Sequence, residues 1–211
     1  MNKSAPLSPT RLKPAAAAVV MRWAVIAFAM LAFAGRSNAS TARTLSFAEL
    51  SKSAEIIADV TVQNVESYWA TPAGVKAIRT KVTFTVNRAI KGNPGQSLAL
   101  EFLGGQVGDR ALAVPGLPRF SVGERFIIFS AGPDQALVCP VLGLDQGAMR
   151  VVHDTESNVD RVYRNWGQPV NENEPFETRV PVTAGVTTRD YLRSADTVER
   201  FTERVRQAVN Q

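Results

Sequence analysis

The chain has 211 residues, with 24 lysines and arginines against 19 aspartates and glutamates. Five of the basic residues and none of the acidic ones lie in the first 39 positions, so residues 40–211 carry equal numbers of both and are neutral. This balance argues against a basic nucleic-acid-binding surface. Cys139 is the only cysteine, which excludes an intrachain disulfide.

Residues 1–39 have the pattern of a secretory signal peptide. A basic flank precedes an apolar run over residues 23–34, Arg36 ends the run, and Ser37-Asn38-Ala39 offers the small residues of a cleavage site. The run is too short to span a bilayer as a helix, and no cysteine follows it that could carry a lipid. The sequence therefore predicts a secreted or periplasmic protein that begins near Ser40 and has no stable membrane anchor. Met21 is an alternative start.

Residues 40–211 have a suitable length for one domain. Ser46 and Glu49 have the spacing of a capping box, which predicts a short helix that ends near Ala54. Partial alternation of apolar residues over 56–65 and clear alternation over 78–86 predict two strands, and residues 71–74 and 91–95 provide turns.

Short strands continue along the chain. Apolar runs and alternation predict them at residues 98–102, 126–129, 137–142, 149–152 and 161–164. Strands of this length and spacing are typical of an antiparallel sandwich or small barrel. If residues 143–147 form a hairpin loop, Cys139 and His153 become diagonal neighbours on one sheet face.

The end of the chain has helical spacing instead. Val198, Phe201, Val205 and Val209 form an apolar stripe, and Asp196 with Glu199 suggests a cap at the start of this helix. We expect the stripe to pack on the barrel. The alternative, a membrane-surface or partner-binding helix, is weaker because the polar face mixes both charges.

Several short motifs over residues 47–152 resemble a known architecture. They are Ala58-Asp59-Val60, Lys91-Gly92, Gly104-Gly105, Gly116-Leu117-Pro118-Arg119-Phe120, Gly123-Glu124-Arg125 and Gln146-Gly147. In this order they are similar to a group of uncharacterised secreted bacterial proteins and, more distantly, to the netrin-like module of tissue inhibitors of metalloproteases. The resemblance implies a single small OB-like β-barrel with a short N-terminal helix and a C-terminal amphipathic helix. The inhibitors use an amino-terminal cysteine and disulfides that this chain lacks, so the resemblance does not extend to their mechanism.

The sequence offers little for catalysis. His153 is the only histidine, so a zinc site of histidines and cysteines lacks ligands, and no Gly-x-Ser-x-Gly motif occurs. Cys139 lies in an apolar run and is expected to be a buried, inert thiol, with a Cys139–His153 nucleophile as the weaker alternative. The glycines of residues 104–108 lack the lysine of a phosphate-binding loop. We therefore assign no catalytic residue, cofactor or metal.

Two acidic groups could in principle hold calcium. They are Asp154, Glu156 and Asp160, and Glu172, Glu174 and Glu177. Neither group has the spacing of an EF-hand loop, so solvated loops are the stronger interpretation, and residues 170–175 have the composition of a surface loop.

Residues 104–123 form the most informative connection. The segment is rich in glycine, contains two prolines, and is long enough to be uncommon without a function. Its side chains are predicted either to plug one end of the barrel or to meet a partner. The candidate partner-binding residues are Arg110, Leu112, Val114, Leu117, Arg119 and Phe120.

Three classes of function fit these observations. The sequence favours an exported, non-catalytic binding or interaction module, whose expected partner is another exported protein. The first alternative is a secreted hydrolase that uses carboxylates in a cleft, and the weaker second alternative is an oligonucleotide-binding OB fold. The neutral charge of residues 40–211 and the predicted export both argue against nucleic acid.

Overall fold

The computed structural model of the chain describes residues 44–133, 138–165, 167–170 and 187–211. The predicted signal peptide, the predicted loop beyond residue 170 and the acidic group Glu172, Glu174 and Glu177 lie outside these ranges. Among the described residues, no helix combines the length and the hydropathy needed to cross a membrane.

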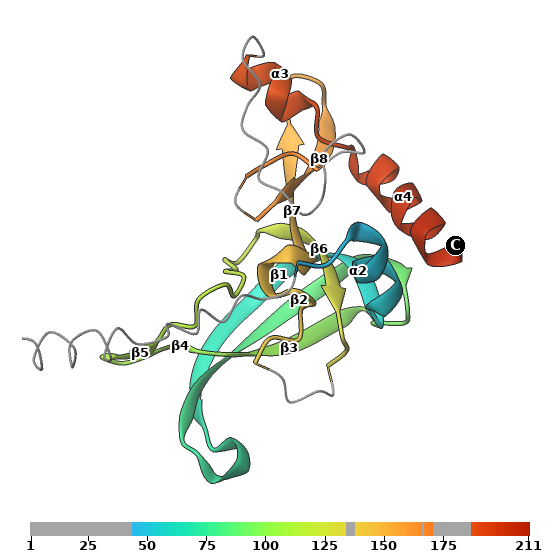
Figure 1. Ribbon diagram of the computed structural model, residues 1–211. Helices are drawn as coiled ribbons and strands as arrows, with labels where there is room; N and C mark the ends of the chain where they lie inside the picture. Colours follow the sequence, from blue (N-terminus) through green and yellow to red (C-terminus); the bar gives the residue numbers. More distant parts are fainter. Residues whose placement is uncertain (1–43, 134–137, 166, 171–186) are drawn as a thin grey trace, which may run out of the picture. The chain divides into compact units, whose positions relative to one another are not determined.

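Strands contribute more residues to the described chain than helices do (Figure 1). The elements are, in chain order, α2 (Phe47–Ser53), β1 (Ile56–Ala70), η1 (Pro72–Gly74), β2 (Ala77–Lys91), β3 (Ser97–Leu103), β4 (Gly105–Val107), β5 (Arg110–Leu112), β6 (Arg125–Ser130), η2 (Leu144–Gly147), β7 (Ala148–Asp154), β8 (Val159–Arg164), α3 (Thr188–Arg193) and α4 (Val198–Asn210).

Six of the strands form one antiparallel sheet in the order β3-β2-β1-β6-β7-β8. A mainly β fold with a short N-terminal helix and C-terminal helices is thereby confirmed. The closed barrel is not found: β3 and β8 lie at the two edges, so the sheet is open as far as the described residues go. The short strands β4 and β5 form a separate hairpin.

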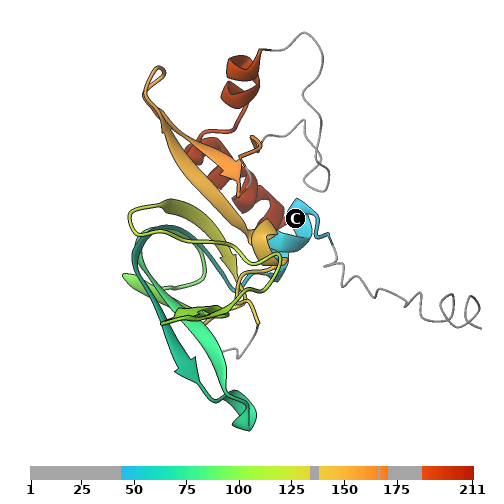
Figure 2. The same ribbon diagram turned by 90° about the vertical axis from the view of Figure 1, so that its left-hand side faces the viewer.

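Strands β1 and β2 are longer than the sequence predicted, at 15 residues each. Their pairing shifts register between Ile57 and Ala58, between Asp59 and Val60, and between Val62 and Asn64. Such bulges bend a strand and increase its twist. The hairpin accordingly curves, and its tip at η1 extends away from the rest of the sheet (Figure 2).

Each face of the sheet carries a buried apolar cluster. On β6, Phe126 and Ile128 belong to one apolar cluster, whereas Ile127 and Phe129 belong to another, because successive side chains of a strand point to opposite faces. Residues of α2 and α4 complete the second cluster. The first cluster is completed by residues of the long connection and by residues 139–144. We call these two sides the helix-covered face and the loop-covered face.

One of the two predicted helix N-caps is confirmed, and the other is wrong. Ser46 and Glu49 form the expected capping box of α2. At α4, however, Thr197 is the N-cap and its hydroxyl accepts a hydrogen bond from the amide of Arg200. Asp196 was expected there, but its carboxylate is buried and paired with Arg200 and Arg204 instead. Helix α3 was not predicted. The apolar stripe of α4 packs on the sheet as expected.

The predicted strand over residues 137–142 is wrong where the chain is described. Residues 138–142 make an isolated bridge between Val141 and Ser130 and a few other backbone hydrogen bonds, but they form no strand, and β6 pairs directly with β7. Pro140 has no amide hydrogen to donate to a ladder, which explains why an apolar run here does not form a strand. The predicted hairpin that made Cys139 and His153 diagonal neighbours therefore does not form.

Candidate functional site

The 104–123 connection leaves β3 through two glycines that other residues could not replace. Gly104 and Gly105 have φ values of +99° and +127°. A Cβ on Gly105 would lie 2.2 Å from the Oγ1 of Thr80 and 2.4 Å from the Oγ of Ser67. This close approach brings the connection against the concave side of β1 and β2, and it then forms the β4–β5 hairpin.

Phe120 anchors the other end of the connection. Its ring centroid lies 5.3 Å from that of Phe84, 5.3 Å from that of Phe102 and 5.0 Å from that of Phe126. Edge-to-face and tilted contacts of this kind add to the free energy of apolar burial. Leu117 is half-buried against the same cluster. At these two positions the connection packs back on the sheet, although the described residues form no closed barrel for it to plug.

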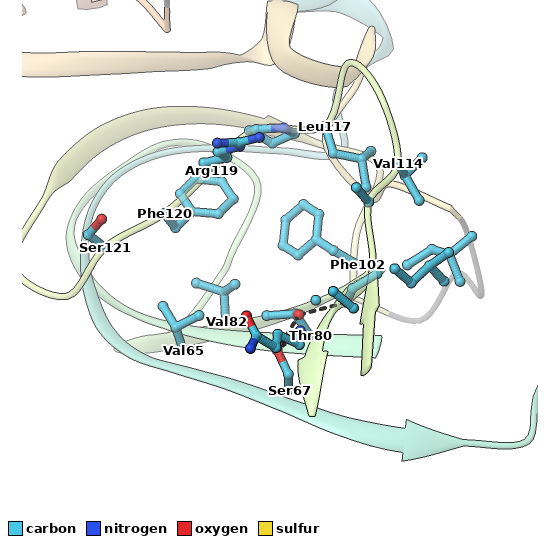
Figure 3. Close-up of a pocket in the computed structure, with 18 residues that line it drawn as sticks. Val65, Ser67, Thr80, Val82, Phe102, Val114, Leu117, Arg119, Phe120 and Ser121 are labelled. Carbon is cyan, nitrogen blue, oxygen red and sulfur yellow. Dashed lines mark hydrogen bonds between the residues drawn. The ribbon is translucent and has the colours of Figure 1, made fainter. Parts of the chain in front are cut away.

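Between its two ends the connection leaves an open groove of about 650 Å³ (Figure 3). The strands contribute Val65, Ser67, Thr80, Val82, Phe102 and Leu103 to its lining, and the connection contributes Gly104, Gly105, Gln106, Ala111, Leu112, Ala113, Val114, Leu117, Pro118, Arg119, Phe120 and Ser121. A volume of this order is common for small-molecule sites. We call it the groove.

Five of the six candidate residues from the sequence line the groove. Leu112 and Arg119 are exposed, and Val114, Leu117 and Phe120 are partly buried. Arg110 is exposed but does not line the groove. The strand residues of the lining were missed, although their alternation identifies which of them share a face. The alternation contains no information on which face the connection would cross.

A second, smaller cavity of about 340 Å³ lies beside β6, β7 and β8. Beside it, Arg125 donates two hydrogen bonds to the buried carboxylate of Asp59, at 2.8 and 2.6 Å, and one to Asp160 at 2.5 Å. Asp160 in turn contacts the Nδ1 of His153 at 2.8 Å. We call these four residues the ionic chain.

The ionic chain favours the charged forms of Arg125 and Asp160. The hydrogen bonds to Asp59 raise the pKa of Arg125. The hydrogen bond from His153, followed by that from Arg125, lowers the pKa of Asp160. A carboxylate held ionised by an arginine is a poor proton donor near neutral pH. This arrangement can orient the His153 ring, but the described residues that line the cavity include no serine, threonine or cysteine as a nucleophile.

Cys139 is separated from His153. The thiol lies in the loop-covered cluster with 9% of the residue exposed, and burial raises its pKa to about 11. His153 follows Met149 and Val151 of the other cluster on β7, and it is half exposed. The Cys139–His153 nucleophile is therefore wrong.

The acidic residues near β7 are used in ion pairs. Asp154 accepts hydrogen bonds from Ser157 and Arg161, and Glu156 pairs with Arg189 and Arg193. Among the described residues, no group of three or more potential ligands is arranged to hold a metal ion.

Comparison of the chain with protein-family models, with curated proteins and with solved structures finds no match. Its function has to be inferred from the two cavities themselves.

Proposed function

We propose that this chain is an exported, non-catalytic binding module and that the groove is its binding site. The observation that carries the proposal is the composition of the groove, in which apolar side chains from three strands face apolar side chains of the connection. Ligand sites are concave and largely apolar, with a few polar groups that orient the ligand. The signal-peptide pattern of residues 1–39 supports export.

Binding is favoured over hydrolysis by the state of the carboxylates. Asp59 and Asp160 both pair with Arg125, and Asp154 pairs with Arg161. A general acid or base has to exchange its proton, which such pairing opposes. Nucleic acid is disfavoured because residues 40–211 are neutral and the groove has a single arginine, which is a weak substitute for a basic groove.

The resemblance to a netrin-like, OB-type barrel stays a prediction. The strong curvature of β1 and β2 supports it, and an open edge at β3 weighs against it.

The proposal is tested by filling the groove from its rim. Ala113 is exposed and lines the groove, so an Ala113→Trp substitution adds a large ring there without disturbing a buried position. Val122→Trp is the matched control, because Val122 is 66% exposed and does not line the groove.

Both variants and the parent chain are recovered from the exported fraction, and everything that copurifies with them is identified by mass spectrometry. We expect the parent and Val122→Trp to retain the same protein or small molecule and Ala113→Trp to lose it. A protein or small molecule that copurifies equally with the parent and both variants would contradict the groove as the binding site.

A further inference from the structure

The polar side chains that line the groove are Ser67, Thr80, Gln106, Arg119 and Ser121. Gln106 uses its side-chain amide to donate to the carbonyl of Gly108 at 3.2 Å, and two other places matter more for a ligand. The Ser67 and Thr80 hydroxyls lie on one side, 2.8 Å apart, and Arg119 lies beside Phe120 on the other side (Figure 3). The two places have different hydrogen-bonding capacities, and this difference indicates what kind of ligand the groove accepts.

The hydroxyl pair has no free donor. Thr80 donates its proton to the carbonyl of Gly104 at 2.7 Å, so Ser67 is the donor between the two hydroxyls. Ser67 in addition accepts a hydrogen bond from the amide of Gln106 at 3.4 Å. Since both protons are used within the protein, this side offers little to an anion or to the carbonyls of a bound peptide.

Arg119 is different, because its donors are free. Of the 18 described residues that line the groove, Arg119 is the only one with a charged side chain. It is exposed, and no described acidic residue pairs with it, whereas Arg79, Arg125, Arg150 and Arg161 each contact a carboxylate. A guanidinium presents a planar set of donors that matches a carboxylate in a bidentate arrangement.

Apart from Gln106 and Ser121, the remaining side chains of the lining are apolar. Phe102 and Phe120 lie side by side, with centroids 5.3 Å apart, and Val65, Val82 and Leu117 add aliphatic surface. A peptide in this space would bury backbone amides with few partners, which costs free energy. A hydrocarbon chain has no such amides and gains affinity from each methylene group that it buries.

We propose that the groove binds an amphipathic carboxylate, a medium-length hydrocarbon chain with one acidic head. The chain lies against Phe102 and Phe120, and the carboxylate accepts hydrogen bonds from Arg119. This ligand class rests on the groove being the binding site under the proposed function, and it names the chemistry of what the site takes.

The test is isothermal titration of the full chain with dodecanoate, dodecanol and dodecyltrimethylammonium, below the concentration at which each forms micelles. We expect dodecanoate to bind at least about tenfold more tightly than dodecanol, because a hydrogen bond to a charged group is worth at least that factor. Dodecyltrimethylammonium should bind more weakly still. In the series of octanoate, decanoate and dodecanoate, each added methylene should tighten binding by about fourfold.

Arg119→Ala should lower the affinity for dodecanoate to that for dodecanol, and Arg119→Lys should restore part of it, since lysine keeps the charge without the planar donors. Arg110→Ala is the matched control. Arg110 lies in the same connection, is exposed and has no acidic partner among the described residues, but it does not line the groove. It should leave the affinity unchanged.

Three results would overturn the proposal: dodecanoate does not bind, it binds no better than dodecanol, or Arg110→Ala weakens it as much as Arg119→Ala. The proposed function fails separately. If Ala113→Trp loses a copurifying protein while dodecanoate does not bind the parent chain, the groove remains the binding site and only the ligand class is wrong.

Discussion

On the helix-covered face, two regular elements present apolar side chains at a constant spacing, and Phe201, Phe47 and Phe129 pack edge to face with centroids 5.5 to 6.4 Å apart. On the loop-covered face, an irregular connection is held at Gly105 and at Phe120, and it spans the groove between them. A helix repeats its contacts along its length, whereas a glycine-rich loop makes them at separate points. A loop that contacts the sheet only at separate points leaves space for a ligand between them.

The largest expected effect lies on the helix-covered face. Phe201 on α4 is fully buried between Phe47 and Phe129, so Phe201→Ala should lower the free energy of unfolding by about 3–5 kcal/mol in urea titration. The exposed Gln207 on the same helix provides the control, and Gln207→Ala should stay within about 0.5 kcal/mol of the parent chain. A loss below about 1 kcal/mol for Phe201→Ala would mean that α4 does not close this face.

A smaller loss is expected at the anchor of the loop-covered face. Phe120 contacts three rings but is only partly buried, so Phe120→Ala should cost about 2 kcal/mol, less than Phe201→Ala. Phe120→Leu keeps most of the volume and should cost less than half as much. If Phe120→Ala leaves the stability unchanged, the side chain is not a plug, and a purely interfacial role becomes the better interpretation.

The helices on one face and the 104–123 connection on the other should also differ in how often they open by local unfolding. Cys139 lies under the loop-covered face, and its raised pKa together with burial makes its labelling depend on opening. We expect a thiol reagent to label it at least about tenfold faster than the single cysteine of the double variant Cys139→Ala, Val205→Cys, which lies under α4. Each rate is divided by the rate of the same chain in denaturant. Equal normalised rates would show that both covers open together.

The smallest expected effect concerns the ionic chain. By strand alternation, the four residues of the ionic chain lie on the helix-covered face. There they form ion pairs beside the apolar cluster: Arg125 pairs with Asp59 and with Asp160, and Asp160 pairs with His153. Because folding lowers the pKa of Asp160, its contribution to stability is present above its unfolded pKa of about 3.9 and is lost as the pH falls through the folded value.

The parent chain should therefore lose more stability than Asp160→Asn between pH 5 and pH 2.5. The difference should stay below about 1 kcal/mol, because Asp160 is partly exposed. It is measured by urea titration at each pH. Asp109→Asn, which removes an exposed carboxylate from the loop-covered side, should reproduce the parent profile. An Asp160→Asn profile identical to that of the parent would show that the ionic chain does not contribute to the stability of this face.

Local signals in the sequence were sufficient for most elements. The capping box of Ser46 and Glu49, the alternation of Val82 with Phe84 and the helical spacing of Phe201 and Val205 each depend on neighbours a few residues apart, and the structure has the predicted element at each place. The prediction that failed, a strand over residues 137–142, used an apolar run without weighing Pro140, and buried apolar segments are needed in loops as well as in strands.

By itself, the sequence determined the charge balance, the secondary structure near these signals and the existence of a long connection over residues 104–123. Only the tertiary structure decided that Ser67, Thr80 and Phe102 face that connection, and that Arg125 joins Asp59 to Asp160 across strands. The physical reason is that an alternating strand has two equivalent faces and a loop has no period. Which surfaces meet is therefore set by the packing of distant segments, and the groove depends on that packing.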